Sequence, residues 1–243
     1  MLASRTASTG ALARSATIKH HDGMQTALPS PKNKKPPTTI IVLGDYVCPY
    51  TYIGVSRLAE LRKVLELEID WRFIESRPET PPQGTPIRAL HFPAADWRAL
   101  MDNLVRMARQ QNLPFQEPTL MVNSRRAILF AEALRAKAID AASRALFDTI
   151  HNRLFAAYFS EGRDIGAASV LTEIAAEYGV QREFLDQAWQ EPTHSERLLE
   201  NQAMAQRIGI KATPAFVIGD EVLEGAVPVA MLAETLVEIH GPH

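Results

Sequence analysis

The first regular pattern of apolar positions lies near residue 39. Residues 39–43 are apolar and rich in β-branched side chains, which predicts a strand over residues 39–44. Apolar residues then recur at helical spacing over residues 49–65, and residues 67–74 alternate as a second strand does. A strand–helix–strand unit of this kind predicts a parallel, right-handed crossover.

A proline-rich loop over residues 77–93 follows the second strand, and we expect it to border a site at the sheet edge. From residue 94 to about residue 190 the apolar spacing is helical, with one apolar face within 97–108 and further helices over 125–139, 141–159, 170–178 and 181–189. A helix over 193–208, a hairpin over 214–224 and a helix over 228–240 complete the chain. The pattern predicts an all-helical subdomain inserted over residues 94–190.

The only cysteine of the chain, Cys48, lies where the first strand passes into the first helix. Cys48 fits the N-cap position, and Pro49 fits the first helical position, where a missing N–H costs nothing. The N–H groups and the dipole of the helix favour a thiolate, so we expect a lowered Cys48 pKa and a nucleophilic sulfur. The alternative is a buried cysteine that behaves as a small apolar residue.

A second stretch, residues 209–225, contains two short strands that meet at a Gly-Asp turn. Pro214 heads the first of these strands, a position where proline removes no needed donor.

Together the two stretches resemble the thioredoxin superfamily. The segment from Asp45 to Gly54, Asp-Tyr-Val-Cys-Pro-Tyr-Thr-Tyr-Ile-Gly, is similar to the active-site segment of cytoplasmic DsbA-like oxidoreductases, including polyketide-pathway members. The resemblance covers most of residues 38–240 and implies an α/β thioredoxin fold formed by residues 38–93 and 191–243. It also implies a cis Thr213–Pro214 bond, with Pro214 catalytic and with Pro214 and the Thr213 backbone holding a substrate strand by edge pairing. Pro49 and Tyr50, next to Cys48, are expected to bind substrate as well.

Thr51 is the main departure from this family, because two-cysteine members carry a second cysteine at that position. A self-contained dithiol oxidase is therefore excluded. A mixed disulfide on Cys48 needs an external thiol, such as glutathione, another protein or a second Cys48 in a homodimer. The Thr51 hydroxyl either donates to the Cys48 thiolate or bonds to the backbone of the first helical turn.

Three further side chains are candidate site residues. Tyr46 and Tyr50 flank Cys48 and either contact substrate or pack in the core. Asn123 precedes a predicted helix, and a similar segment reaches the active site in related glutathione-using enzymes. The alternative for Asn123 is a helix cap.

Two other functions fit the same fold. Kappa-class glutathione transferases and hydroxychromene-carboxylate isomerases resemble this architecture and carry Ser-Pro-Tyr-Ser where this chain has Cys-Pro-Tyr-Thr. Their usual glutathione clamp after the hairpin is missing here, because residues 224–228 read Glu-Gly-Ala-Val-Pro, which favours the oxidoreductase branch. The remaining alternative is a redox-inactive binding module.

Composition further limits the partners and cofactors that we expect. A formal net charge of −2 argues against nucleic acid as the main partner, and no apolar run approaches the length of a membrane span. The histidines are scattered, and no nucleotide-binding or serine-hydrolase motif is present, so we expect no metal and no tightly bound cofactor. Residues 1–37 are poor in acids and rich in Pro, Ser and Arg. They predict a disordered leader and a cytoplasmic protein, or alternatively an organellar transit peptide.

Overall fold

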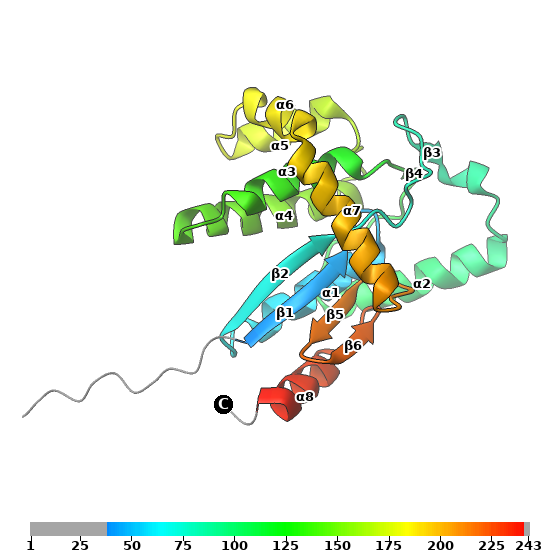
Figure 1. Ribbon diagram of the computed structural model, residues 1–243. Helices are drawn as coiled ribbons and strands as arrows, with labels where there is room; N and C mark the ends of the chain where they lie inside the picture. The colour runs from blue at the N-terminus through cyan, green and yellow to red at the C-terminus, as the bar shows by residue number, and fades with distance from the viewer. Residues whose placement is uncertain (1–37, 241–243) are drawn as a thin grey trace, which may run out of the picture. The chain divides into compact units, whose positions relative to one another are not determined.

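The computed structural model describes residues 38–240, so the predicted leader over residues 1–37 lies outside the described residues. A four-stranded mixed sheet in the order β2-β1-β5-β6 is at the centre (Figure 1). Strand β1 (Thr38–Gly44) pairs in parallel with β2 (Leu67–Phe73) over its whole length. On its other side β1 pairs antiparallel with β5 (Ala215–Ile218), which continues into β6 (Glu221–Glu224). The two predicted strand regions and the predicted hairpin are thus confirmed.

Helices cover both faces of this sheet. Helices α1 (Pro49–Leu61) and α8 (Val229–His240) lie together on one face, whereas α7 (Pro192–Arg207) crosses the other (Figure 1). Alternate residues of β1 belong to different clusters: Ile40 and Val42 to the main core, Leu43 to a smaller core with Ala205 of α7. Burial on both faces explains why residues 39–43 are apolar without alternation.

The segment between the two halves of the sheet is largely helical, as predicted. Its helices are α2 (Ala94–Gln110), α3 (Arg125–Ala136), α4 (Ala141–Phe159), α5 (Ala168–Glu177) and α6 (Arg182–Gln190). Two predicted helices end too late, α1 at 65 instead of Leu61 and α3 at 139 instead of Ala136. Val64 lies in a turn after α1 and Ile139 in an irregular segment after α3, and they are 77% and 82% exposed.

Two short strands were not predicted. Strand β3 (Thr85–Pro86) pairs antiparallel with β4 (Leu120–Met121), and a 3₁₀ turn, η1 (Ile87–Leu90), follows β3. The proline-rich loop is therefore partly ordered by pairing, and the 94–190 segment contains one strand. Elements of two residues carry no periodic pattern, which is why the sequence could not indicate them.

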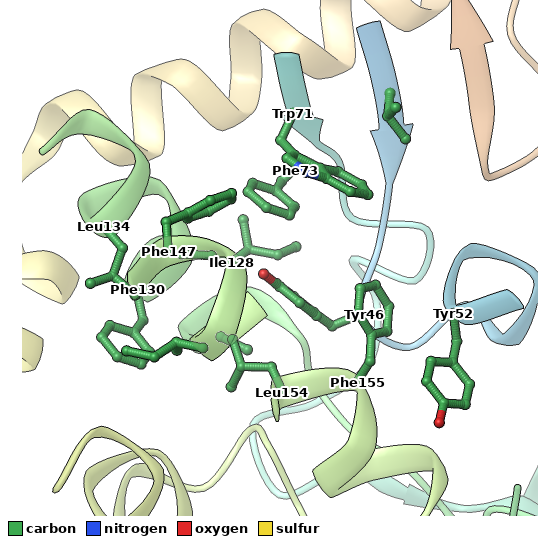
Figure 2. Close-up of a cluster of buried hydrophobic side chains, with 14 of the residues drawn as sticks. Tyr46, Tyr52, Trp71, Phe73, Ile128, Phe130, Leu134, Phe147, Leu154 and Phe155 are labelled. Atoms are coloured by element: carbon green, nitrogen blue, oxygen red, sulfur yellow. The ribbon is translucent and has the colours of Figure 1, made fainter. Parts of the chain in front are cut away.

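Sheet and helical insertion share one core. Figure 2 shows aromatic side chains from β1's end, β2 and α4 packed together, including Tyr46, Trp71, Phe73, Phe147 and Phe155. The Tyr46 ring stacks on Phe73 at 5.3 Å, and its hydroxyl is hydrogen-bonded to Nδ1 of buried His151 at 2.7 Å. Burial lowers the pKa of His151 to about 3, so this imidazole is neutral. Tyr46 is therefore a packing residue, and the substrate-contact alternative for it is wrong.

Candidate active site

Cys48 is the N-cap residue of α1, and Pro49 occupies the first helical turn, as predicted. Its carbonyl accepts the backbone N–H groups of Thr51 at 3.0 Å and Tyr52 at 3.2 Å, and its own N–H donates to the Asp45 carbonyl at 3.2 Å. A tight turn between β1 and α1 thus places the sulfur of the partly buried Cys48 at the N-terminus of the helix.

The sulfur meets the loop before β5. Cys48 Sγ lies 3.3 Å from the carbonyl oxygen of Thr213 and donates to it. The Thr213–Pro214 peptide bond is cis, as the resemblance implies. Two residues that are 165 positions apart in the chain therefore form the centre of the site.

Gly54 in α1 makes this approach possible. A Cβ atom at position 54 would lie 3.1 Å from Pro214 Cγ and 3.0 Å from Phe216 Cζ, closer than real Cβ contacts usually come. Only glycine lets α1 pack this closely against the Pro214 ring and keeps Cys48 within reach of Thr213.

The charge state of Cys48 differs from the prediction. Burial raises the pKa of the Cys48 thiol and outweighs the lowering effect of the polar groups of Thr213 and Thr51 beside it. The nearby Asp45 carboxyl also raises the pKa of Cys48. The expected lowered pKa is thus wrong for the resting protein, because the thiol is enclosed by protein and points its hydrogen at a carbonyl acceptor.

Asp45 anchors the turn that carries Cys48. Its buried carboxylate accepts from the backbone N–H of Ser76 at 2.7 Å, from the Ser76 hydroxyl at 2.6 Å and from the Val47 N–H at 3.3 Å. Burial raises the pKa of Asp45, while these hydrogen bonds lower it. The contacts tie the end of β1 to the residues that follow β2. An acid inside an apolar stretch was the sequence signal for this role.

A cavity of about 580 Å³ opens beside Cys48. Pro49, Tyr50 and Thr213 line it with Cys48, and the predicted border loop contributes Arg77, Pro78 and Phe92. Much of the remaining wall is apolar and comes from α2, the 115–121 segment and the end of α4: Trp97, Leu100, Met101, Phe115, Met121 and Phe159. Of the two predicted flanking tyrosines, Tyr50 alone reaches the cavity.

Asn123 is placed differently from the substrate-binding prediction. Its amide nitrogen donates to the Thr80 carbonyl at 2.6 Å, and its oxygen accepts the Arg125 N–H at 3.0 Å. Both ends of the side chain are thus bonded to backbone, and Asn123 is not among the residues that line the cavity. The N-cap residue of α3 is Ser124, so Asn123 supports the start of the helix from one residue before the cap position of the capping alternative. Its neighbour Arg125 forms an ion pair with Glu75 at 2.8 Å.

The geometry agrees with the comparisons with known proteins. The family model described as the DSBA-like thioredoxin domain matches residues 39–237. This chain belongs to the DsbA-like thioredoxin family. It is 27% identical over 190 residues to the uncharacterized protein YwbO of Bacillus subtilis (strain 168), which covers 77% of this chain and 90% of YwbO.

We compare this DsbA-like protein with two of the solved structures that share its fold. The probable DsbA oxidoreductase SCO1869 from Streptomyces coelicolor has a TM-score of 0.71 and 18% identity, with 85% of this chain and 91% of the other covered. The cytosolic disulfide reductase DsbM from Pseudomonas aeruginosa, solved with GSH, has a TM-score of 0.59 and 22% identity, with coverage of 82% and 98%. At these identities the likeness establishes the fold.

Within this DsbA-like site, Thr51 is buried and its hydroxyl has no hydrogen-bond partner of normal geometry. The predicted alternative of a bond to the backbone of the first turn is therefore wrong. The side chain is wedged against β1, because a Cβ at Gly44 would lie 2.6 Å from Thr51 Cγ2. An unpaired buried hydroxyl beside Cys48 is free to donate to a charged sulfur.

Glu224 is a site residue that the sequence did not indicate. From β6 its carboxylate accepts the backbone N–H of Ala212 at 3.0 Å and that of Lys211 at 3.3 Å. Directly after β6, the Gly225 N–H donates to the Pro214 carbonyl at 2.7 Å. These bonds hold the 211–214 segment against the hairpin. An exposed acid on a short strand carries no sequence signal for such a role.

Two further findings concern residues 38–240. No group of three or more His, Cys, Asp or Glu side chains in this part of the chain is arranged to hold a metal ion. Among its helices, none combines the length and the apolar character required to cross a membrane.

Proposed function

We propose that this DsbA-like protein is a monothiol thiol–disulfide oxidoreductase in which Cys48 forms a mixed disulfide that an external thiol resolves. The observation that carries the proposal is the Cys48 sulfur at a cavity wall, 3.3 Å from the Thr213 carbonyl next to Pro214. The sequence contains no second cysteine, and Thr51 occupies the place of a resolving thiol.

The reaction has two steps. The Cys48 thiol loses its proton, and the thiolate attacks one sulfur of a disulfide, forming a new S–S bond while the other sulfur leaves as a thiolate and takes up a proton. An external thiol then attacks the mixed disulfide, restores the Cys48 thiol and leaves as a new disulfide. Transfer of the Cys48 proton away from Thr213 and donation by the Thr51 hydroxyl both favour the attacking thiolate.

Glutathione is the external thiol that the charges around the cavity favour. Lys211 and Arg77 both line the cavity, Arg77 with a partly exposed ion pair to Glu79 at 3.7 Å, and cations there suit the carboxylates of glutathione. The DsbM structure named above contains GSH, which supports the same choice. Glutathione acts here as a co-substrate, and the proposal includes no tightly bound cofactor. A second Cys48 in a homodimer is the competing resolving thiol. A cytoplasmic location, where glutathione keeps thiols reduced, completes the proposal.

The test is incubation of the full chain with glutathione disulfide, followed by intact mass measurement and turnover with a glutathionylated peptide. We expect one glutathione on Cys48 and steady turnover when reduced glutathione is supplied. The Cys48→Ser variant must lose both. Cys48–Cys48 dimers on non-reducing analysis, with no glutathione adduct, contradict glutathione and favour the homodimer. Absence of both adduct and turnover overturns the oxidoreductase and leaves a redox-inactive binding module.

A second candidate function rests on Thr51. Its hydroxyl is unpartnered but buried and does not line the cavity, so donation to the thiolate of a bound glutathione, as a glutathione-dependent isomerase or transferase requires, needs the start of α1 to open. This function predicts conjugation of glutathione to an electrophile that survives Cys48→Ser and falls in Thr51→Val. The oxidoreductase predicts instead that activity is lost in Cys48→Ser, so this variant separates the two functions.

A further inference from the structure

The backbone groups next to Pro214 are largely bonded within the protein. The N–H groups of Lys211 and Ala212 donate to Glu224, and the Pro214 carbonyl accepts from Gly225. The Thr213 carbonyl accepts the Cys48 thiol. Binding of a peptide as an added strand requires free N–H and C=O groups along an edge. Edge pairing of a protein substrate, which the resemblance implies, therefore has few groups available here.

The cavity offers a different kind of recognition. Its volume of about 580 Å³ lies in the range of small-molecule sites. Aromatic and thioether side chains form much of its wall: Phe92, Trp97, Met101, Phe115, Met121 and Phe159. Such a wall stabilises an apolar or aromatic body through burial and ring contacts, whereas an extended polypeptide would leave its polar groups unpaired there.

Two of the aromatic residues in this wall, Phe92 and Trp97, are held in place by contacts with each other and with Glu117. Phe92 stacks on Trp97 with ring centroids 5.2 Å apart and an interplanar angle of 17°, and Trp97 Nε1 donates to Glu117 at 2.6 Å. A second cavity of about 650 Å³ shares Ile87, Phe92, Trp97 and Pro118 with the first. The stacked pair therefore contributes apolar surface to both cavities.

Charged side chains also line the cavity. Glu75 on the cavity wall is neutralised by its ion pair with Arg125, whereas the exposed Lys211 ammonium makes no ion pair in the described part of the chain. The same cavity wall thus offers the Lys211 cation for an anionic group and an apolar surface that includes Trp97 for an apolar group.

We propose that the substrate of this site is a low-molecular-weight mixed disulfide with one aromatic or apolar half and one anionic half, such as a glutathione mixed disulfide of an aryl-alkyl thiol. This inference rests on the proposed function. Cys48 attacks the glutathione sulfur, and the apolar thiol leaves from the cavity with the proton that Cys48 gave up. Reduced glutathione then attacks the Cys48–glutathione disulfide, which restores Cys48 and releases glutathione disulfide. The sum converts one mixed disulfide and one glutathione into one apolar thiol and one glutathione disulfide.

The test compares two mixed disulfides of glutathione, one with 2-phenylethanethiol and one with 2-mercaptoethanol, at a fixed concentration of reduced glutathione. Burial of a phenyl ring predicts a kcat/KM about tenfold or more higher for the phenylethyl substrate. Phe92→Ala should reduce that ratio several-fold, while Leu199→Ala, which shortens a 64% exposed apolar residue on α7, should leave it unchanged. Equal rates for the two disulfides, or faster turnover of a disulfide-bonded polypeptide, overturn the inference and leave the oxidoreductase intact.

A binding measurement keeps the inference testable without turnover. S-(2-phenylethyl)glutathione and S-(2-hydroxyethyl)glutathione are stable analogues of the two substrates, and calorimetry on the Cys48→Ser variant reports their affinities. About tenfold tighter binding of the phenylethyl analogue supports the inference. Absence of exchange with every disulfide overturns the proposed function, and equal or undetectable binding of both analogues overturns the substrate class.

Discussion

Gly54 of α1 packs directly against Pro214, the residue just before β5. Pro214 follows Thr213, whose carbonyl accepts from the Cys48 thiol. The space between Gly54 and Pro214 is too small for one additional carbon, since a Cβ at residue 54 would lie 3.1 Å from Pro214 Cγ. This contact sets how close the helix that carries Cys48 comes to the loop that carries Thr213. The separation of Cys48 Sγ and Thr213 O therefore depends on it.

The first prediction changes this contact. Gly54→Ala should lower the free energy of unfolding by about 1–3 kcal/mol, because the added methyl group overpacks a site already filled by Pro214 and Phe216. It should also slow exchange with a glutathionylated peptide. Urea unfolding and turnover measure the two effects. Ser56→Ala on the same helix is the control, and equal stability of the two variants would show that the interface can relax.

The second prediction concerns the protonation of Cys48. Because burial raises the pKa of this thiol above its ordinary value, the thiolate fraction at neutral pH is small. The rate of alkylation by iodoacetamide should then rise about tenfold per pH unit through neutral pH, with a midpoint above that of a free cysteine, about 8.5. Rates measured from pH 6 to pH 10 by intact mass check this. A midpoint below the free-cysteine value would restore the lowered pKa expected from the helix N-terminus alone.

The third prediction separates two consequences of the Thr51 hydroxyl. Thr51→Val removes a buried hydroxyl that has no partner, so stability should rise by about 1 kcal/mol. The same hydroxyl lowers the pKa of Cys48, so the alkylation midpoint should move to higher pH. Thermal unfolding and the pH profile are the measurements. Loss of stability together with an unchanged midpoint would mean that the hydroxyl is satisfied within the fold.

The fourth prediction follows from His151. Burial lowers its pKa to about 3 in the folded protein, so the unfolded chain binds more protons at this residue below its ordinary pKa of 6.5. Stability from neutral His151 is fully present above pH 6.5 and is lost as the pH falls towards 3, by about 1.4 kcal/mol per pH unit. Urea unfolding at about pH 7 and about pH 5 measures this slope.

The control for His151 keeps the Tyr46 hydrogen bond. In His151→Asn the amide oxygen can still accept from the Tyr46 hydroxyl, but nothing at this position titrates. The variant should be less stable at neutral pH, because it loses ring packing, and its stability should fall less steeply with acid. The same acid slope in both proteins would assign the effect to other groups.

The fifth prediction tests Glu224 as a positioning residue. Glu224→Ala frees the N–H groups of Lys211 and Ala212 and loosens the loop next to Pro214, so kcat/KM should fall by about fivefold, equivalent to about 1 kcal/mol. Glu221→Ala, at an exposed position on the same strand, is the matched control. Partial recovery in Glu224→Gln, which retains an acceptor oxygen, would support positioning over a general effect of charge.

Much of the fold could be predicted because its elements have periodic patterns. The strand over 39–44, the Cys48–Pro49 helix start, the hairpin after Pro214 and the helical insertion are all carried by local spacing and turn residues. The predicted helix ends at residues 65 and 139 were wrong, since an exposed apolar residue beyond a helix end continues a periodic pattern without continuing the helix. Strands β3 and β4 are too short to have any pattern.

The sequence by itself determined that one nucleophilic atom is available, that it begins a helix and that no second thiol can resolve its disulfide. Only the tertiary structure decided the direction of the Cys48 pKa, the backbone contacts of Asn123 and the contribution of Glu224. The physical reason is the distance along the chain between the groups that interact. Helix and strand formation follow from neighbouring residues, whereas desolvation and hydrogen bonding of a side chain depend on groups such as Thr213 that only folding brings close.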